Sequence, residues 1–293
     1  MTRLRADLLL LLASLIWGGA FVGQSTAMAH MGPFTFIGAR FVLASLALLP
    51  FALVEARNAV GPMPAGRVPA LIGIGVVFFC GVALQQVALV RTSVTHAGFL
   101  TALYVVMVPA IGAVFLRHKL PGVIWPAAAL SLAGTFLLGG GRIDGLGWGD
   151  AMLVVGAVFW AGQIIGLGAL AFDLRRPVMI TLTQFAVTAA LGLAAGFVFE
   201  TPNLDAALLC WREIAYTGFL SGGLAFTLQT IAQAHTPPAD SAILLSMESV
   251  FAALFGALLL GERLTLIGWT GGAMVLAAAI LVQVTPLMKL RRT

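Results

Sequence analysis

Charged residues are scarce in this sequence. Asp, Glu, Lys and Arg account for 9% of the 293 residues, whereas soluble domains carry about a quarter, and 60% of the residues are hydrophobic. The two cysteines, Cys80 and Cys210, lie in or beside apolar runs, so neither a disulfide framework nor a metal cluster is expected. The net charge of +5 is spread over the ends of the apolar runs, which indicates membrane topology instead of nucleic-acid binding. The composition therefore predicts an integral membrane protein.

Motifs for catalysis are missing as well. The sequence has no P-loop, which excludes direct driving by ATP within this chain, and no H-E-x-x-H or G-x-S-x-G. Gly147-Trp148-Gly149-Asp150 matches the G-x-G-D of intramembrane aspartyl proteases, but no second acid lies at matching depth. We expect Asp150, like Asp7, to cap the start of a helix. An enzyme acting on lipid-linked substrates would need clustered acids or histidines at one membrane face, and the loops here are too short and bare. We predict no enzyme, no catalytic residues and no cofactor.

Ten apolar runs are long enough to cross a bilayer as helices, which takes about 20 residues. They lack the alternating pattern of barrel strands. The runs are 7–26, 34–54, 68–90, 94–116, 121–140, 149–171, 177–199, 211–233, 237–260 and 264–285. The first run resembles a signal peptide, but the same helix recurs inside the chain, which argues against cleavage.

Basic residues are distributed unevenly between the two sides of these spans. With the N-terminus in the cytoplasm, eleven of the 16 Lys and Arg residues fall inside and four outside, and Arg40 lies within a span. This distribution satisfies the positive-inside rule, and an even number of spans places both termini in the cytoplasm.

The sequence repeats itself after about half its length. Asp7, Trp17, Gly19 and Gly23 match Asp150, Trp160, Gly162 and Gly166, each 143 positions later. Residues between Gln85 and Trp125 match those between Gln229 and Trp269, each 144 positions later. Five spans in each half orient the halves, 1–143 and 144–293, oppositely across the membrane, as is typical of secondary transporters. We expect an all-α integral membrane protein of ten transmembrane helices, arranged as two inverted five-helix repeats around a central cavity.

A single carboxylate, Glu248, lies near the centre of the span 237–260. An acid at this depth is costly, so it marks a functional site by default. Three roles are open. Glu248 could bind a substrate ammonium group, exchange protons, or accept hydrogen bonds from neighbouring hydroxyls such as Ser246 and Ser249.

Aromatic residues also occur at mid-depth, although Trp and Tyr normally prefer the membrane interfaces. They could line a cavity that offers ring faces to a flat or cationic substrate group, or fill gaps between helices. The candidate substrate-binding residues, with their polar neighbours, are Trp17, Phe79, Tyr104, Trp160, Gln163, Ser246 and Glu248. Arg40 could capture a carboxylate or snorkel to the headgroups. Gln85 and Gln229 are expected to be structural.

Hinges are expected at Pro109, which removes a backbone hydrogen bond, and at Gly222 and Gly223 in the middle of a span. Most other glycines are expected to permit close packing of helices. They form the G-x-x-x-G pairs Gly19/Gly23, Gly162/Gly166, Gly192/Gly196, Gly218/Gly222 and Gly268/Gly272.

The second half ends in a distinctive pattern, from Glu248-Ser249-Val250 to Gly261-Glu262-Arg263-Leu264. With the ten spans and the two halves, it resembles the EamA-like transporters of the drug/metabolite transporter superfamily over essentially the whole chain. Family members usually have proline where Ser249 stands, and the first half has Tyr104 at the position of the acid. The overall pattern is most similar to the YddG-type amino-acid exporters. The resemblance implies a basket of helices around a central cavity, with the fifth and tenth helices at the periphery.

We therefore predict a multi-pass secondary transporter of a bacterial cytoplasmic (inner) membrane. It would export small metabolites, foremost amino acids including aromatic ones, by alternating access. The alternative is a multidrug or lipophilic-cation exporter of the same superfamily, because aromatic rings and one acid suit such a cation equally well. The expected partners are a small-molecule substrate and the lipid bilayer, without nucleic acid or metal, and the sequence is compatible with a monomer.

Overall fold

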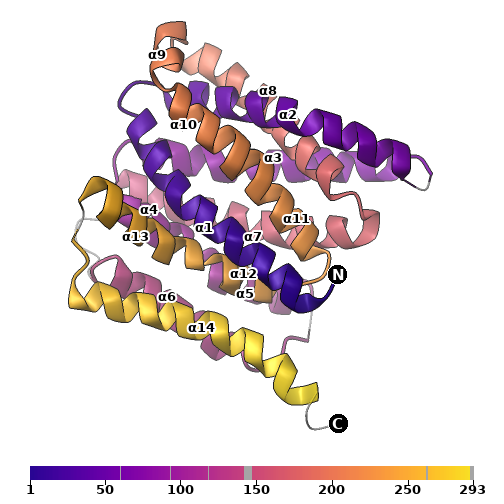
Figure 1. The fold of residues 1–293 in the computed structure, drawn as a ribbon, viewed down its shortest axis with the longest axis vertical. Helices are drawn as coiled ribbons and strands as arrows, with labels where there is room; N and C mark the ends of the chain where they lie inside the picture. The colour runs from indigo at the N-terminus through magenta and orange to yellow at the C-terminus, as the bar shows by residue number, and fades with distance from the viewer. Residues whose placement is uncertain (60, 93, 118, 142–146, 262, 291–293) are drawn as a thin grey trace.

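The computed structural model describes residues 1–59, 61–92, 94–117, 119–141, 147–261 and 263–290, and these residues form helices and loops without a β-strand (Figure 1). Glu262 of the expected motif lies outside the described residues. By length and composition, 8 of the described helical segments can cross a membrane. The chain is therefore an all-helical, multi-pass membrane protein.

The membrane-crossing segments follow the expected apolar runs. They are α1 (Arg3–Ala27), α2 (Pro33–Asn58), α3 (Val68–Ala88) after the 3₁₀ turn η1 (Ala65–Arg67), α4 (Val94–Thr101) with α5 (Tyr104–Val114), α7 (Trp148–Leu174), α8 (Pro177–Phe199), α12 (Pro238–Leu245) with α13 (Met247–Leu260), and α14 (Leu266–Leu290). Proline occupies the first turn of α2, α3, α8 and α12, where its missing N–H has no partner to lose.

Two of the ten expected spans look different. The run 121–140 forms α6 (Ile124–Leu138), which is apolar but has only 15 residues. The run 211–233 is divided into α10 (Trp211–Ala215), the π-helix η2 (Tyr216–Phe226) and α11 (Thr227–Gln233). A short helix, α9 (Leu204–Leu209), precedes them and was not expected.

The two expected caps have different outcomes. Asp150 accepts a hydrogen bond from the Gly147 N–H at 2.9 Å, which confirms its role at the start of α7. Asp7 does not cap α1, because that helix begins at Arg3, earlier than expected, and Thr2 is its N-cap. Asp7 instead contacts residues from elsewhere in the fold, as described below.

Two membrane-crossing segments are interrupted near their centres. α4 ends at Thr101 and α5 begins at Tyr104, while Ser246 separates α12 from α13. The interruptions lie about 144 residues apart, so they fall at positions that the sequence repeat relates to each other. Pro109, an expected hinge, lies inside α5, after the interruption.

Helices α2 and α8 pack against each other and cap each other (Figure 1). Glu200, which follows α8, accepts hydrogen bonds from the N–H groups of Phe34 and Thr35 at 2.8 Å each, at the start of α2. Glu55, near the end of α2, accepts from Val178 and Met179 at 3.1 and 2.8 Å, at the start of α8. Each carboxylate satisfies orphan N–H groups at the positive end of the partner helix. The contacts also require the two helices to be antiparallel.

We expect Glu200→Gln to lower the free energy of unfolding by about 1 kcal/mol, because a neutral amide is a weaker cap than a carboxylate. Thermal unfolding of the purified protein in detergent would measure this loss. Asp205→Asn is the control, since Asp205 is an exposed acid on the neighbouring helix α9. Equal losses in the two variants would show that the cap contributes nothing.

Helices α6 and α14 lie side by side along one edge of the bundle (Figure 1). Their backbones approach so closely that a Cβ atom on Gly271 would lie 2.4 Å from the carbonyl oxygen of Gly134. The pair Gly192/Gly196 likewise packs on α2, against Gly38 and Thr35. Absence of a side chain at these positions lets the helices touch.

Large apolar side chains cover much of the outside of the bundle. Phe199 is 74% exposed, Phe197 72% and Leu258 69%. Soluble monomers rarely expose contiguous apolar surface on this scale, whereas lipid tails cover it in a membrane. The first helix α1 begins, and the last helix α14 ends, at the same end of the bundle (Figure 1).

Candidate functional site

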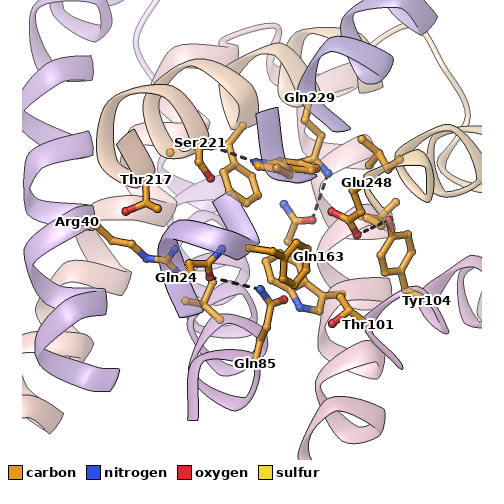
Figure 2. Close-up of a pocket in the computed structure, with 18 of the residues that line it drawn as sticks. Gln24, Arg40, Gln85, Thr101, Tyr104, Gln163, Thr217, Ser221, Gln229 and Glu248 are labelled. Atoms are coloured by element: carbon orange, nitrogen blue, oxygen red, sulfur yellow. Dashed lines mark hydrogen bonds between the residues drawn. The ribbon is translucent and has the colours of Figure 1, made fainter. Parts of the chain in front are cut away.

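A cavity lies inside the helix bundle, between α1, α2, α3, α7, η2 and the two interrupted segments (Figure 2). The space open to the centre of a water molecule is about 50 Å³. One water needs at least about 10 Å³ by this measure, so this conformation has room for a few waters, and a larger ligand requires the lining side chains or helices to move apart. Aromatic, amide and hydroxyl side chains line it, together with one acid and one arginine.

Five of the seven predicted binding residues line this cavity, namely Trp17, Tyr104, Trp160, Gln163 and Glu248. Phe79 and Ser246 do not. The neighbouring ring of Phe78 is fully buried and faces the cavity's aromatic residues, and one helical step turns Phe79 toward a partly exposed position.

Ser246 serves the interruption between α12 and α13. Its hydroxyl lies 2.8 Å from the Ser131 hydroxyl of α6 and donates to the Ile243 carbonyl at 2.6 Å. It therefore holds the broken segment against α6.

Glu248 and Tyr104 lie next to each other on one side of the cavity (Figure 2). The Tyr104 hydroxyl donates to Glu248 Oε1 at 2.9 Å, and the two side chains are 3% and 6% exposed. The residues are 144 positions apart, which is the spacing of the repeat, so the bond joins equivalent positions of the two halves. Within the described residues, the expected serine donors serve other acceptors, since Ser249 donates to the Gly98 carbonyl.

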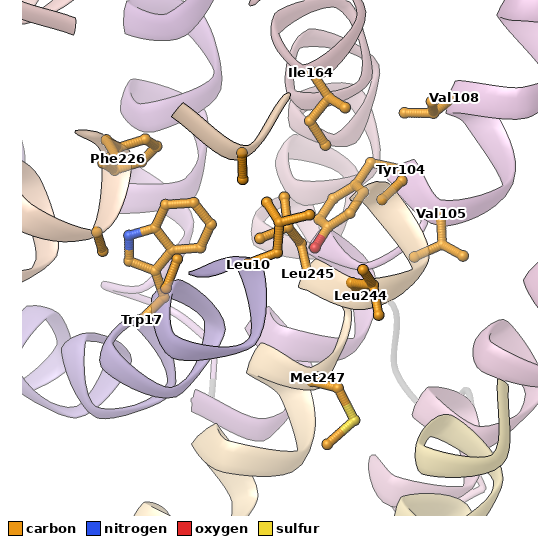
Figure 3. Packing of buried hydrophobic residues seen from close by; sticks show 14 of the residues in the cluster. Leu10, Trp17, Tyr104, Val105, Val108, Ile164, Phe226, Leu244, Leu245 and Met247 are labelled. Carbon is orange, nitrogen blue, oxygen red and sulfur yellow. The ribbon is translucent and has the colours of Figure 1, made fainter. Parts of the chain in front are cut away.

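The aromatic residues form one connected cluster (Figure 3). The ring of Phe226 lies between the two tryptophans, 4.4 Å from Trp17 and stacked at 6.3 Å from Trp160. The Trp17 indole donates to the Ser221 carbonyl of η2 at 3.1 Å, which fixes its orientation. Phe78 and Phe41 extend the cluster toward α2. Ring faces and edges of this kind can hold a flat or apolar part of a ligand.

Glutamines of the cavity wall take part in one chain of two hydrogen bonds and in one hydrogen-bonded pair (Figure 2). Gln229 donates to Gln163 at 3.4 Å, and Gln163 in turn donates to Gln184 at 3.3 Å. Gln85 donates to Gln24 at 3.4 Å. Gln85 and Gln229 therefore form the interhelical hydrogen bonds that were expected of them. They also line the cavity, which was not expected.

Arg40 is buried beside the cavity, with only 5% of its surface exposed. Its guanidinium carbon lies 5.3 Å from the ring centre of Phe36 and 4.8 Å from that of Phe41. The side chain does not snorkel to the outer surface, so the second of the two expected roles is wrong.

Several polar atoms of the residues that line the cavity form no hydrogen bond. Four lining residues each keep a buried polar atom without a hydrogen-bond partner: Arg40 Nε, Thr101 Oγ1, Trp160 Nε1 and Gln229 Oε1. Buried polar groups are normally paired. The wall is therefore suited to an occupant with polar groups of its own.

The predicted hinge at Gly222 and Gly223 lies in the π-helix η2, and Gly222 lines the cavity. π-Helical turns are rare and occur frequently at functional sites. Gly222 lies close to α2, where a Cβ atom would be 3.1 Å from the Ala44 side chain. Among the described residues, no group of three His, Cys, Asp or Glu side chains could hold a metal ion.

Several lining residues were not singled out from the sequence: Phe21, Gln24, Phe41, Val82, Thr101, Thr217, Ser221 and Phe226. Gln24 and Thr101 could have been found, because polar residues within long apolar runs are few. Phe226 and Val82 carried no such signal, since apolar residues fill every span.

The helices and a cavity lined by aromatic and polar side chains define a membrane protein that can hold a small molecule. Comparison with known proteins gives the family. The model of the EamA-like transporter family matches the chain twice, at residues 4–140 and 147–284. The chain belongs to this family, which is part of the drug/metabolite transporter superfamily, and it is a transporter rather than an enzyme.

Individual relatives agree with this assignment. An uncharacterized transporter of Archaeoglobus fulgidus is 33% identical over 96% of this chain and 86% of its own length. The uncharacterized inner membrane transporter YedA of Escherichia coli K12 is 26% identical over 92% of this chain and 87% of its own. A crystal structure with 19% sequence identity superposes with a TM-score of 0.78 over 96% of each chain, which shows a shared fold.

Proposed function

We propose that this transporter exports small metabolites, foremost amino acids including aromatic ones, by alternating access at the central cavity. The observation that carries the proposal is the cavity where the two interrupted segments meet, which is lined by a buried acid, a buried arginine and aromatic rings. Discontinuous helices at the midplane are a common feature of secondary-transporter sites. A zwitterion with an apolar side chain offers matching groups to all three elements.

We further propose ten spans in two inverted five-helix halves, residues 1–143 and 144–293. The reciprocal capping of α2 and α8 supports this arrangement, because Phe34 and Thr35 precede Val178 and Met179 by 144 positions. The Tyr104–Glu248 bond and the matched interruptions of the helices support it too. On this arrangement α10, η2 and α11 together form the eighth span and α6 the fifth.

A second reciprocal contact joins the two halves of the sequence repeat. The Thr236 hydroxyl donates to Asp7 Oδ1 at 2.7 Å, and the Thr92 hydroxyl donates to Asp150 Oδ1 at 3.2 Å. The acids are related by the repeat, and so are the threonines. In an inverted pair of halves, five crossings separate Asp7 from Asp150, so these contacts lie at opposite faces and can close opposite ends of the cavity.

The contact at Asp7 belongs to a cluster of charged side chains. Arg3 reaches both Asp7, with Nε 3.6 Å from Oδ2, and Asp240 at the start of α12. This cluster joins the first helix to the segment that carries Glu248, at the face where we place the cytoplasm.

We expect Asp7→Asn and Asp150→Asn to change access to the cavity in opposite directions, by about tenfold each, because each weakens a charged hydrogen bond at one end. The measurement is labelling of Gln163→Cys, in a background without native cysteines, by a membrane-impermeant thiol reagent in vesicles of either orientation. Asp173→Asn is the control, because Asp173 pairs with Arg67 at an exposed site. Shifts in the same direction would contradict the two-gate arrangement.

The multidrug or lipophilic-cation alternative is supported by the acid and the stacked rings, but not by the buried arginine, which would repel a cation. We place the protein in a bacterial inner membrane with both termini cytoplasmic, in keeping with YedA and the basic inner loops, and the YddG-type exporters remain the proposed subgroup. A monomer encloses the cavity without a partner chain.

Uptake of labelled compounds into liposomes containing the purified protein tests the proposal. The panel would hold several amino acids and one lipophilic cation, with and without an imposed pH gradient. Uptake of amino acids, competed by aromatic ones, is the expected result. Gradient-dependent uptake of the cation alone would transfer the assignment to the alternative.

A further inference from the structure

Arg40 is a buried cation without an anionic partner. None of the ion pairs among the described residues includes it, and its Nε has no hydrogen-bond acceptor. An uncompensated charge at this depth is costly, and the two phenylalanine faces beside it offset only part of that cost. The folded protein therefore buries a guanidinium group whose charge no described side chain neutralises.

Most acids elsewhere in the described structure are engaged in other contacts, and Asp205 and Glu213 form no ion pair with Arg40. Glu248 is held by Tyr104 on the opposite side of the cavity from Arg40 (Figure 2). The others with known contacts are Glu55 and Glu200 at helix starts, Asp7 and Asp240 with Arg3, and Asp173 with Arg67. A counter-charge for Arg40 is thus best supplied from outside the chain, through the cavity that the residue lines.

We propose that Arg40 binds the carboxylate of the transported substrate, an inference that rests on the proposed function and narrows its substrate class to carboxylates. A guanidinium offers five N–H donors in a planar fork that matches a carboxylate. The cavity has a single arginine, which can neutralise one negative charge, and an acid at its other side, which would repel a second. A carboxylate is therefore a better ligand than a doubly charged phosphate.

The neighbours of Arg40 fit this role. Gln24, Thr217 and Ser221 lie on the same side of the cavity as Arg40 and provide polar groups around it (Figure 2). The rings of Trp17, Phe226 and Trp160 line the same cavity. The cavity therefore has an anion-binding pole at Arg40 and a cation-binding pole at Glu248, with aromatic rings in its wall.

Probes with a single charge can separate the two poles. 3-Phenylpropionate carries only the carboxylate, phenethylamine carries only the amine, and L-phenylalanine carries both on the same ring and chain. Isothermal titration of the purified protein in detergent measures their affinities directly. The variants are Arg40→Gln and Glu248→Gln, which remove one charge each from the same cavity.

We expect Arg40→Gln to weaken binding of 3-phenylpropionate at least about tenfold and to leave phenethylamine as tight or tighter. Glu248→Gln should show the opposite selectivity. Arg40→Lys keeps the charge without the fork and should fall between wild type and Arg40→Gln. This lysine variant also carries the comparison if Arg40→Gln does not fold, and Arg91→Gln, at an exposed arginine, is the control for lost charge.

Unchanged affinity of Arg40→Gln for 3-phenylpropionate would overturn the inference, and so would absence of carboxylate binding by the wild type. Uptake of labelled L-phenylalanine by wild-type liposomes separates this outcome from failure of the proposed function. Uptake that does not depend on Arg40 leaves amino-acid export standing and removes the role of Arg40. If L-phenylalanine is not taken up but 3-phenylpropionate binds in a manner that depends on Arg40, amino-acid export is excluded and the protein is a transporter of other carboxylates.

Discussion

Glu248→Gln is expected to reduce transport of amine-bearing substrates roughly 30- to 100-fold. Glutamine keeps the shape of the side chain and can still accept the Tyr104 hydrogen bond, but it has no charge for an ammonium group and no proton to exchange. A hydrogen bond to a charged group contributes about 2–3 kcal/mol, which corresponds to this range. Initial rates of uptake into liposomes, measured between pH 5 and 9, provide the test.

Two further variants separate binding from structure. Tyr104→Phe removes only the hydroxyl that donates to Glu248 at 2.9 Å, so its effect should be smaller, about tenfold or less. Asp205→Asn removes an exposed acid and should transport normally. If Glu248→Gln kept both the full rate and the pH profile of the wild type, ammonium binding and proton exchange would both be excluded.

Gly271→Ala is expected to destabilise the protein by about 3 kcal/mol and lower its melting temperature by about 10 °C. The added Cβ would lie 2.4 Å from the Gly134 carbonyl oxygen and 2.5 Å from the Leu138 amide nitrogen. Both atoms belong to the backbone of α6, so the two helices would have to separate. Fluorescence-detected size exclusion after heating would measure the loss.

The next residue provides a matched control. A Cβ on Gly272 would meet nothing closer than 3.8 Å, so Gly272→Ala adds ordinary contact to a helix and should be neutral or slightly stabilising. Similar melting temperatures for the two alanine variants would contradict the close approach of α6 and α14.

Apolar runs were sufficient to predict most of the membrane-crossing helices. Pro33 and Pro177 mark the starts of two helices because proline fits the first turn, and both starts were predicted within one residue. The interruptions near Tyr104 and Ser246 were not predicted, because each lies inside a run long enough for one continuous helix and has no glycine or proline at the break. The π-helix was missed because its residues have the same composition as an α-helical span.

The glycines show where periodicity alone fails. Gly268 and Gly272 were expected to permit close packing of the last helix, yet the closest approach to α6 is at Gly271, while a Cβ on either of the other two would lie 3.8 Å from Leu138 of α6. A helical step of one residue rotates a side chain by about 100°, so spacing identifies a face but not which partner it meets. By contrast, Gly192 and Gly196 do pack closely against α2, as expected.

The site was predictable where a residue conflicted with its surroundings. A carboxylate at mid-depth, and tryptophans away from the interface, pointed to residues that line the cavity. Glu55 and Glu200 were missed because acids near span ends are unremarkable until the partner helix is placed beside them. Their separation of 145 residues was a signal that could have been found.

The burial of Arg40 has a practical consequence for finding the substrate. A ligand that neutralises this guanidinium removes the cost of burying an unpaired charge, so its binding should raise the melting temperature of the protein. At a concentration one hundred times its dissociation constant, a ligand stabilises the folded state by about 2.7 kcal/mol. Melting curves of the detergent-solubilised protein against a library of small acids would then rank candidate substrates before any flux is measured.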